Sequence, residues 1–268
     1  MKRISIISIY FCLFLFLISC QKQPAWQALF NGQNLDNWDK YIGTPLKGQD
    51  SLFNLATLEN VFSVVDVNGE KLIKISGTVN GSLATKESLQ NYHLKLVFKW
   101  GEVVYTTRNS GLLYHSFGDF GAAIGTWMTN IECQLMHDNL GDTYLMNNTL
   151  CESAAKPDST GKFFFTPGAE PLKFGDGLSG KSVKKLRDAE KPLGEWNTVE
   201  LYSLGETTVH VVNGVTVMVN QKTGINENGV TKPLTSGKIQ LQSEGGELFI
   251  KSIEFCSIDK LPEEILPK

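Results

Sequence analysis

Apolar and polar residues alternate with period two through most of the chain. The alternation is clearest over residues 92–100 and 208–220. Because successive side chains of a strand point to opposite faces, this pattern predicts strands with one face in a core. The other segments with strand-like patterning are residues 61–76, 110–116, 130–136, 195–204, 237–245 and 247–255. No amphipathic helix of useful length and no internal repeat interrupts them.

Two Asn-Gly pairs divide the patterned segments into hairpins. Asn68-Gly69 and Asn213-Gly214 each stand between two short apolar runs, and this dipeptide suits turns that need positive φ at both central positions. Many short strands with turn signals predict an all-β sandwich of two antiparallel sheets, or a jelly roll. Residues 140–192 are rich in Gly, Pro and charge, which favours loops over a site rather than a second domain.

The first residues have the form of a lipoprotein signal peptide. Lys2 and Arg3 precede an apolar run over residues 4–18, which is too short to span a bilayer as a helix. The run ends in Leu-Ile-Ser-Cys, a lipobox-like sequence with Cys20 as the lipidated residue. A plain secretory signal or a membrane anchor is the alternative. The expected organisation is a signal peptide at 1–19, a tether at 20–25, the β domain at 26–258 and a polar C-terminal tail at 259–268.

Composition narrows the possible partners and compartment. The chain is 41% hydrophobic with a formal charge of −3, and it has no basic cluster with interleaved aromatics, which argues against a nucleic-acid partner. The segment after Cys20 has no acidic cluster, which favours a periplasm-facing anchor. Cys133, Cys151 and Cys256 are an odd number in the mature chain, so they cannot all pair.

Residues 130–139 present a polar face whose purpose the alternation does not explain. Ile131, Cys133 and Leu135 share the face expected to enter the core, whereas Glu132 and Gln134 point the other way. Several known catalytic patterns are absent: the Gly-x-Ser-x-Gly elbow, the Walker loop, the dinucleotide fingerprint and the zincin motif.

Six segments, taken in order, resemble the 3-keto-disaccharide hydrolase domain family. They read ALFNGQNLDNW, YHLKLVFKW, RNSGLLYH, NIECQLMHDN, GEWNTVELYSLGETTVHVVNGVTV and GKIQLQSEGGELFIKSIEF. The resemblance covers about residues 26–255 and implies a concanavalin-like jelly roll, as in lipoproteins of Bacteroidetes. It also implies cleavage of glycosides whose sugar a separate dehydrogenase has oxidised to a 3-keto form. Family members often end the late strand with Gln-Asp-His-Gly, where this chain has Gln242-Ser243-Glu244-Gly245.

The implied reaction needs a base, a cation or donors for the ketone, and an acid. A ketone at carbon 3 acidifies the proton on carbon 2, and the resulting enolate expels the substituent at carbon 1. We expect Glu132 to be the base, because it lies on a strand and off the core face; the alternative is a solvated surface Glu. Arg108 is the candidate for the ketone oxygen. His137 is a candidate acid or metal ligand if a bulge at Leu135-Met136 brings it to the Glu132 face.

The remaining candidates would bind substrate. Glu244 becomes a second carboxylate in the cleft if its strand borders that of Glu132. Trp196 and Tyr144 are further candidate sugar platforms, and His115 is either packed or in the cleft. The substrate-binding candidates are Asn109, Gln134, Asp138, Gln242, Glu244 and Trp127. No cofactor is certain, and a divalent metal is possible.

Two further functions compete with the 3-keto reaction. A lectin-like module would bind glycans on the same face without cleaving them. An ordinary glycoside hydrolase would need two carboxylates flanking the scissile bond. The expected partners are an oligosaccharide or glycoside substrate, the membrane through the lipid anchor, and a pathway dehydrogenase.

Overall fold

The computed structural model describes residues 25–267. The predicted signal peptide, Cys20 and nearly all of the tether lie outside the described residues. The strands are β1 Gln27–Ala28, β2 Trp38–Ile42, β3 Phe62–Val67, β4 Glu70–Ile75, β5 Gly81–Thr85, β6 Leu89–Gln90, β7 Tyr92–Asn109, β8 Gly111–Phe117, β9 Thr129–Gln134, β10 Thr143–Met146, β11 Thr149–Pro157, β12 Phe163–Phe165, β13 Pro171–Gly175, β14 Ser182–Val183, β15 Asn197–Leu204, β16 Thr207–Val212, β17 Val215–Glu227, β18 Val230–Pro233 and β19 Ser236–Ser257.

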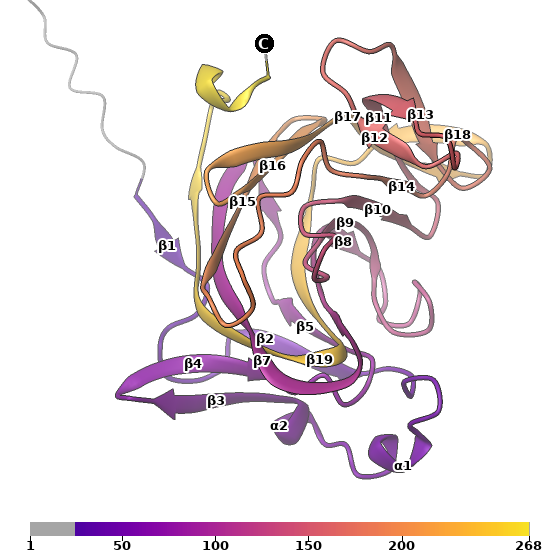
Figure 1. The fold of residues 1–268 in the computed structure, drawn as a ribbon. Coiled ribbons are helices and arrows are strands. Elements are labelled where there is room, and N and C mark those ends of the chain that lie inside the picture. Colours follow the sequence, from indigo (N-terminus) through magenta and orange to yellow (C-terminus); the bar gives the residue numbers. More distant parts are fainter. Residues whose placement is uncertain (1–24, 268) are drawn as a thin grey trace, which may run out of the picture.

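The strands form a sandwich of antiparallel sheets, as predicted. The front sheet has the order β2–β5–β19–β8–β9–β10–β14. The back sheet has the order β3–β4–β19–β7–β15–β16–β17. The long strand β19 contributes its first half to the front sheet and its second half to the back sheet (Figure 1). The jelly-roll prediction is therefore confirmed.

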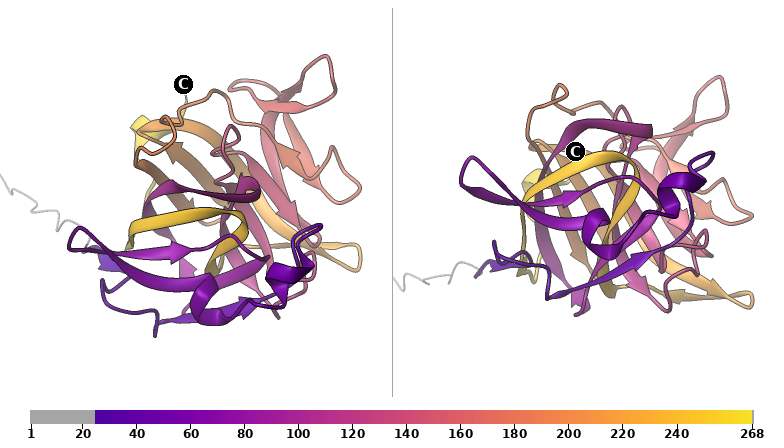
Figure 2. Two further views of the ribbon diagram at one scale, coloured as in Figure 1. Left: turned by 60° about the horizontal axis from the view of Figure 1, so that its bottom comes forward. Right: turned by 90° about the horizontal axis from the view of Figure 1, so that it is seen from below.

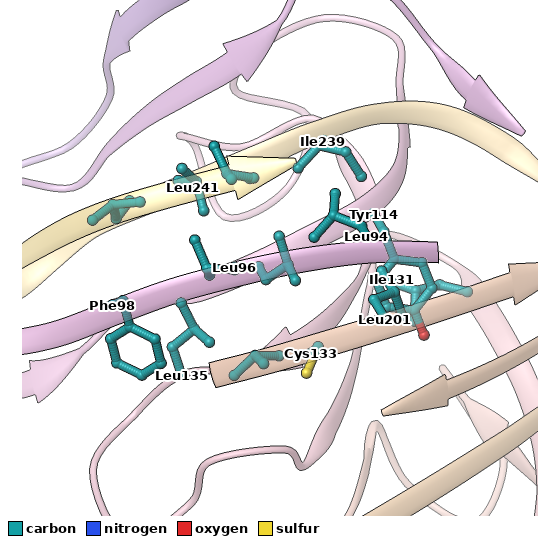
Figure 3. Close-up of a cluster of buried hydrophobic side chains, with 14 of the residues drawn as sticks. Leu94, Leu96, Phe98, Tyr114, Ile131, Cys133, Leu135, Leu201, Ile239 and Leu241 are labelled. Carbon is teal, nitrogen blue, oxygen red and sulfur yellow. The ribbon is translucent and has the colours of Figure 1, made fainter. Parts of the chain in front are cut away.

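The core lies between the two sheets and follows the predicted alternation. Leu94, Leu96 and Phe98 of β7, with Leu201 of the adjacent strand β15, pack against Tyr114, Ile131, Cys133, Ile239 and Leu241 of the front sheet, and all of these residues are buried (Figure 3). Removing this apolar surface from water is the main stabilising contribution to the fold. The free thiols of Cys133, Cys151 and Cys256 are all buried, so the predicted core position of Cys133 is confirmed.

Both Asn-Gly hairpins form where the sequence predicts them. The φ angles are 55° and 83° at Asn68-Gly69, which joins β3 to β4. They are 49° and 80° at Asn213-Gly214, which joins β16 to β17. These angles lie in the left-handed region that Asn and Gly tolerate.

Helices are short and peripheral. The two α-helices are α1 Asp50–Phe53 and α2 Leu58–Val61, and η1 Glu263–Ile265 is a 3-10 turn. Viewed from below, the N-terminal segment that carries α1 and α2 comes to the front (Figure 2). Within residues 25–267, no helix combines the length and apolar character needed to cross a bilayer.

Two segments differ from the expectation. Residues 140–192 contain β10 to β14, and β10 extends the front sheet beside β9. Apart from β11, with nine residues, these strands have at most five residues, which is too short for a period-two pattern to stand out. The predicted polar tail docks through Ile265, which is buried against Tyr202 and Val209. Thr216 Oγ1 also donates a hydrogen bond to the Ile265 carbonyl, at 2.7 Å.

Candidate active site

The outer face of the front sheet, directed away from the core, carries the polar side of β9. Glu132 stands opposite Leu113 of β8 and opposite Tyr144 of β10. Gln134 lies two residues further along the same face, opposite Gly111. The predicted division of β9 into a core face and a polar face is therefore confirmed.

Glu132 and Gln242 converge above Gly111. A methyl group placed on Gly111 would lie 2.3 Å from Glu132 Oε1 and 2.6 Å from Gln242 Oε1. Such distances are far inside van der Waals contact, so the absence of a Cβ at this position creates the space that both polar groups share. A glycine inside a strand commonly marks such a close approach.

Buried polar atoms without a hydrogen-bond partner are concentrated on this face. Six of the eleven such atoms in the described residues are Asn109 Oδ1, Asn130 Oδ1, Glu132 Oε1, Gln240 Nε2, and both Oε1 and Nε2 of Gln242. Within the described residues, the Glu132 carboxylate has neither a hydrogen bond nor an ion-pair partner. Buried polar groups normally find partners, because leaving one unpaired costs about 1–3 kcal/mol. A cluster of unpaired groups therefore indicates a face built to bind a polar ligand.

Two carboxyl groups belong to this face. Glu132 is 2% exposed, and its burial raises its pKa well above the usual range, with nearby Glu244 and Asp142 adding to the rise. Glu244 pairs in register with Asn109 on the neighbouring strand. Burial raises the pKa of Glu244 to about 7, although the Asn109 side chain lowers it in part. Buried carboxyl groups with raised pKa values are typical of acid–base sites.

Arg108 and His137 lie on the opposite side of the strands. The amides of Leu135 and His137 donate to the carbonyls of Ser110 and Arg108, at 2.9 and 3.0 Å. This two-residue spacing is that of a regular antiparallel ladder, so no bulge resets the alternation at Leu135-Met136. The conditional placement of His137 beside Glu132 is therefore wrong. By the same alternation, Arg108 shares the side of Ser110 rather than that of Asn109. Arg108 Nε is buried without a partner, and neither carboxyl pKa is lowered by this residue.

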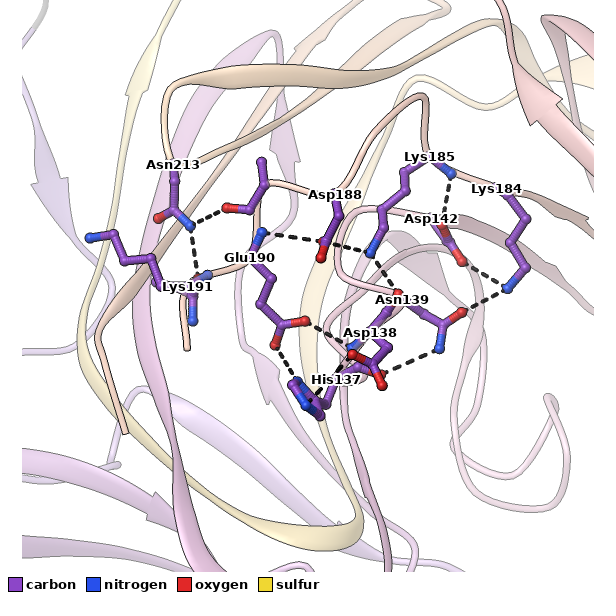
Figure 4. A network of polar contacts seen from close by, with 12 residues as sticks. His137, Asp138, Asn139, Asp142, Lys184, Lys185, Asp188, Glu190, Lys191 and Asn213 are labelled. Atoms are coloured by element: carbon purple, nitrogen blue, oxygen red, sulfur yellow. Dashed lines mark hydrogen bonds and ion pairs between the residues drawn. The ribbon is translucent and has the colours of Figure 1, made fainter. Parts of the chain in front are cut away.

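His137 instead joins a separate polar cluster with Asp138 and Glu190 (Figure 4). His137 Nδ1 lies 3.0 Å from Glu190 Oε1, and the Asp138 amide donates to Glu190 Oε2 at 2.8 Å. One ligand atom from each of the three side chains lies within 4.8 Å of the others, which is a geometry that can hold a divalent cation. Asp138, proposed from the sequence to bind substrate, belongs to this cluster and is exposed.

Trp127 forms a wall of the outer face rather than an open platform. Its side chain is 2% exposed, and its indole donates to the Gly81 carbonyl at 3.1 Å. It packs with Leu113 and Met146 in a small cluster on the outer face. The backbone amide of Met128 donates to Gln240 Oε1 at 3.2 Å, so the segment that contains Trp127 is hydrogen-bonded to the front sheet.

The other aromatic candidates and His115 have different surroundings. Trp196 lies beneath the ammonium groups of Lys99 and Lys251, and Lys99 belongs to the back-sheet strand β7. Tyr144 is half-buried beside Glu132. His115 is packed: it is fully buried, with Nε2 at 3.4 Å from Ser203 Oγ.

Comparison with known proteins agrees with this fold. A family model described as a 3-keto-alpha-glucoside-1,2-lyase-like domain matches residues 25–256. Two structures from Parabacteroides distasonis ATCC 8503, both assigned as glycosyl hydrolases, superpose over 87% of this chain. They cover 100% and 94% of their own chains, with TM-scores of 0.51 and 0.50 and identities of 18% and 20%.

A third similar structure was reported with endo-acting O-glycanases of the human gut microbiota that initiate mucin breakdown. It matches 87% of this chain and 100% of its own, with a TM-score of 0.51 and 12% identity. At these identities the structural matches establish the fold alone. No curated protein matches the sequence significantly.

Proposed function

The chain belongs to the 3-keto-alpha-glucoside-1,2-lyase-like domain family, and from this premise we propose that it cleaves 3-keto glycosides at the outer face of its front sheet. Family membership supports a carbohydrate-related, hydrolase-like activity. The observation that carries the more specific proposal is the convergence of Glu132 and Gln242 above Gly111, with both side chains lacking partners.

The two carboxyl groups divide the proton transfers between them. Glu132 removes the proton from carbon 2, and the electron pair moves through the enolate to break the bond between carbon 1 and the leaving oxygen. Glu244 donates a proton to that oxygen. Addition of water to the resulting double bond completes net hydrolysis. Each positioned acid or base of this kind typically contributes a factor of about 10²–10⁴ to the rate.

The amides hold the substrate and the developing oxyanion. The Gln242 side-chain nitrogen is buried and without a partner, and the amide group to which it belongs shares the space above Gly111 with Glu132. A hydrogen bond to the ketone oxygen strengthens as negative charge develops on it, so this donor favours the enolate over the ketone. Asn109 and Gln134 are the proposed contacts to sugar hydroxyls. The position of Arg108 on the other side of the strands does not support its predicted contact with the ketone oxygen.

A comparison of oxidised and parent sugars tests the reaction class. Residues 21–268 are incubated with a 3-keto disaccharide and with the unoxidised parent, with and without a chelator. We expect cleavage of the keto form alone. Binding of both sugars without turnover would favour the lectin-like alternative, and cleavage of the parent would favour an ordinary glycoside hydrolase. Loss of cleavage with chelator would assign a metal ion to the reaction, for which the His137 cluster is the first candidate.

The rate should increase with pH through about 7. Below that pH both carboxyl groups are protonated, since burial raises both pKa values, and the site holds no base. Near the pKa of about 7 of Glu244 the pair loses its first proton, and in the active form the remaining proton is on Glu244 while Glu132 is ionised. We expect a rising limb of kcat/KM near pH 7. Glu244→Gln should move that limb, because Glu132 then ionises alone, and an unchanged profile in this variant would contradict the shared proton.

We also propose that the mature protein is anchored through lipidated Cys20 and faces the periplasm, where a separate dehydrogenase would supply the 3-keto substrate. The support is the lipobox-like sequence and the absence of an acidic cluster after it. Mass spectrometry of the mature N-terminus should find a diacylglyceryl group on Cys20. An unmodified N-terminus, or one cut at another residue, would contradict the anchor.

A further inference from the structure

A pocket with a mixed polar and apolar lining adjoins the proposed catalytic face. Its volume is about 330 Å³, and its lining includes Gln134, Asn139, Asp142, Tyr144, Ser182 and Lys184. It is continuous with the catalytic face through two residues. Tyr144 is the cross-strand neighbour of Glu132, and Gln134 lies two residues from Glu132 on the same face. Its volume is at the lower end of the range for small-ligand pockets.

Hydrogen bonds fix one wall of this pocket. Lys184 Nζ donates to Asn139 Oδ1 at 3.0 Å and to Asp142 Oδ2 at 2.8 Å (Figure 4). The Lys185 backbone amide donates to Asp142 Oδ1 at 2.7 Å. Lys184 and Asp142 therefore neutralise each other, and the pair offers no net charge to a ligand. This favours an uncharged ligand over an anionic one.

The rest of the pocket lining offers an aromatic ring and free polar groups. Tyr144 is half-buried, and within the described residues its hydroxyl makes no hydrogen bond. The same holds for the Ser182 hydroxyl and for the Gln134 side-chain nitrogen, whose amide oxygen accepts from the Met136 amide at 2.9 Å. An aromatic face with nearby donors suits the apolar face and the hydroxyl groups of a pyranose ring.

We propose that this pocket binds a second, uncharged sugar unit of the substrate, the one that leaves when the bond to the 3-keto sugar breaks. This inference rests on the proposed function and extends it, because it makes the protein selective for disaccharides over glycosides with small leaving groups. Tyr144 is then a specificity-determining residue that contacts the leaving sugar.

The test compares two substrates in three variants. The substrates are a 3-keto disaccharide and methyl 3-keto-α-glucoside, whose leaving group is too small to occupy the pocket. Tyr144→Ala should lower kcat/KM for the disaccharide by about tenfold or more, with little change for the methyl glycoside. Ser182→Tyr, which adds bulk to the pocket, should show the same selectivity. Trp196→Ala removes a half-buried aromatic residue that lies under Lys99 and Lys251, and it should change neither rate.

Equal losses on both substrates in the two pocket variants, or no loss on either, would overturn the subsite. A binding measurement separates this outcome from failure of the proposed function. If the wild-type protein cleaves neither keto substrate, saturation-transfer NMR with the unoxidised disaccharide and methyl α-glucoside still reports on the pocket. A preference for the disaccharide that Tyr144→Ala removes supports the subsite, whereas equal binding by both proteins contradicts it.

Discussion

Glu132→Gln should abolish cleavage of a 3-keto disaccharide and at the same time stabilise the protein. The activity loss follows because glutamine cannot take up the proton from carbon 2, and it should be at least about 10²-fold to 10⁴-fold. The stability gain follows because the wild-type carboxyl is buried without a partner and its pKa is raised. Because the folded-state pKa of this carboxyl is raised, its contribution to wild-type stability is fully present below the unfolded-state pKa. That contribution is lost as pH rises through the folded-state value.

The magnitude of that gain can be measured by thermal unfolding. Relief of an unpaired buried polar group is worth on the order of 1–3 kcal/mol, and each kcal/mol shifts Tm by roughly 2–4 °C in a domain of this size. The increase should be larger at pH 8 than at pH 4, because the penalty for burying the Glu132 carboxyl applies only where the unfolded-state carboxyl ionises.

Glu200→Gln is a matched control for this substitution. Glu200 lies on the back-sheet strand β15, 2.7 Å from His93 Nε2, and the contact with His93 lowers the pKa of its carboxyl. Its replacement should leave cleavage unchanged and should not stabilise the protein. Retained cleavage in Glu132→Gln would remove Glu132 from the mechanism, and a lower Tm in this variant would show that its carboxyl has a stabilising partner.

Gly111→Ala should reduce cleavage about a hundredfold without changing any charge. The added methyl group would lie within 3 Å of both Glu132 and Gln242, so at least one of these side chains must move. A displacement of about 1 Å in a catalytic group can cost about 10²-fold in rate. The kinetic effect should appear mainly in kcat, since the misplaced groups act on the reacting atoms.

Gly224→Ala provides the control for a crowded strand glycine away from the site. Its added methyl would lie 2.8 Å from the Lys232 carbonyl oxygen, on β17 beside β18. We expect this variant to lose stability but to keep its kcat. Wild-type kinetics in Gly111→Ala would show that the space above Gly111 is not where the reaction occurs.

The alternation of residues was sufficient to predict the sandwich and the orientation of Glu132. Period-two segments identify strands because burial of one face is a local requirement on the sequence. The two Asn-Gly pairs identify hairpins because positive φ at the turn is a local requirement as well. The same alternation separates Glu132 and Gln134 from the core residues of β9. Pairing between distant strands is not local, so the sequence placed Glu244 near Glu132 only on the condition that their strands are neighbours. That condition is not met, because β8 lies between β19 and β9.

The errors at Arg108 and His137 have a common physical cause. Both assignments required these side chains to reach the Glu132 face, but the hydrogen-bond ladder continues regularly past Leu135 and keeps them on the other side. Applied strictly, the alternation already opposes this placement. Tyr144 was placed in a loop-rich region because β10 has only four residues. Gly111, inside an apolar strand, was the available signal for a close approach by other groups.

The most direct test of the mechanism is the isotopic composition of the released sugar. A 3-keto disaccharide with hydrogen at carbon 2 is cleaved in D₂O, and the 3-keto product is examined by NMR at early times. The released 3-keto sugar, added to Glu132→Gln in D₂O, is the control for spontaneous exchange. Elimination followed by hydration should place deuterium at carbon 2 at the rate of cleavage with the wild-type protein. Cleavage that leaves hydrogen at carbon 2 would mean direct displacement at carbon 1, and would contradict proton abstraction by Glu132.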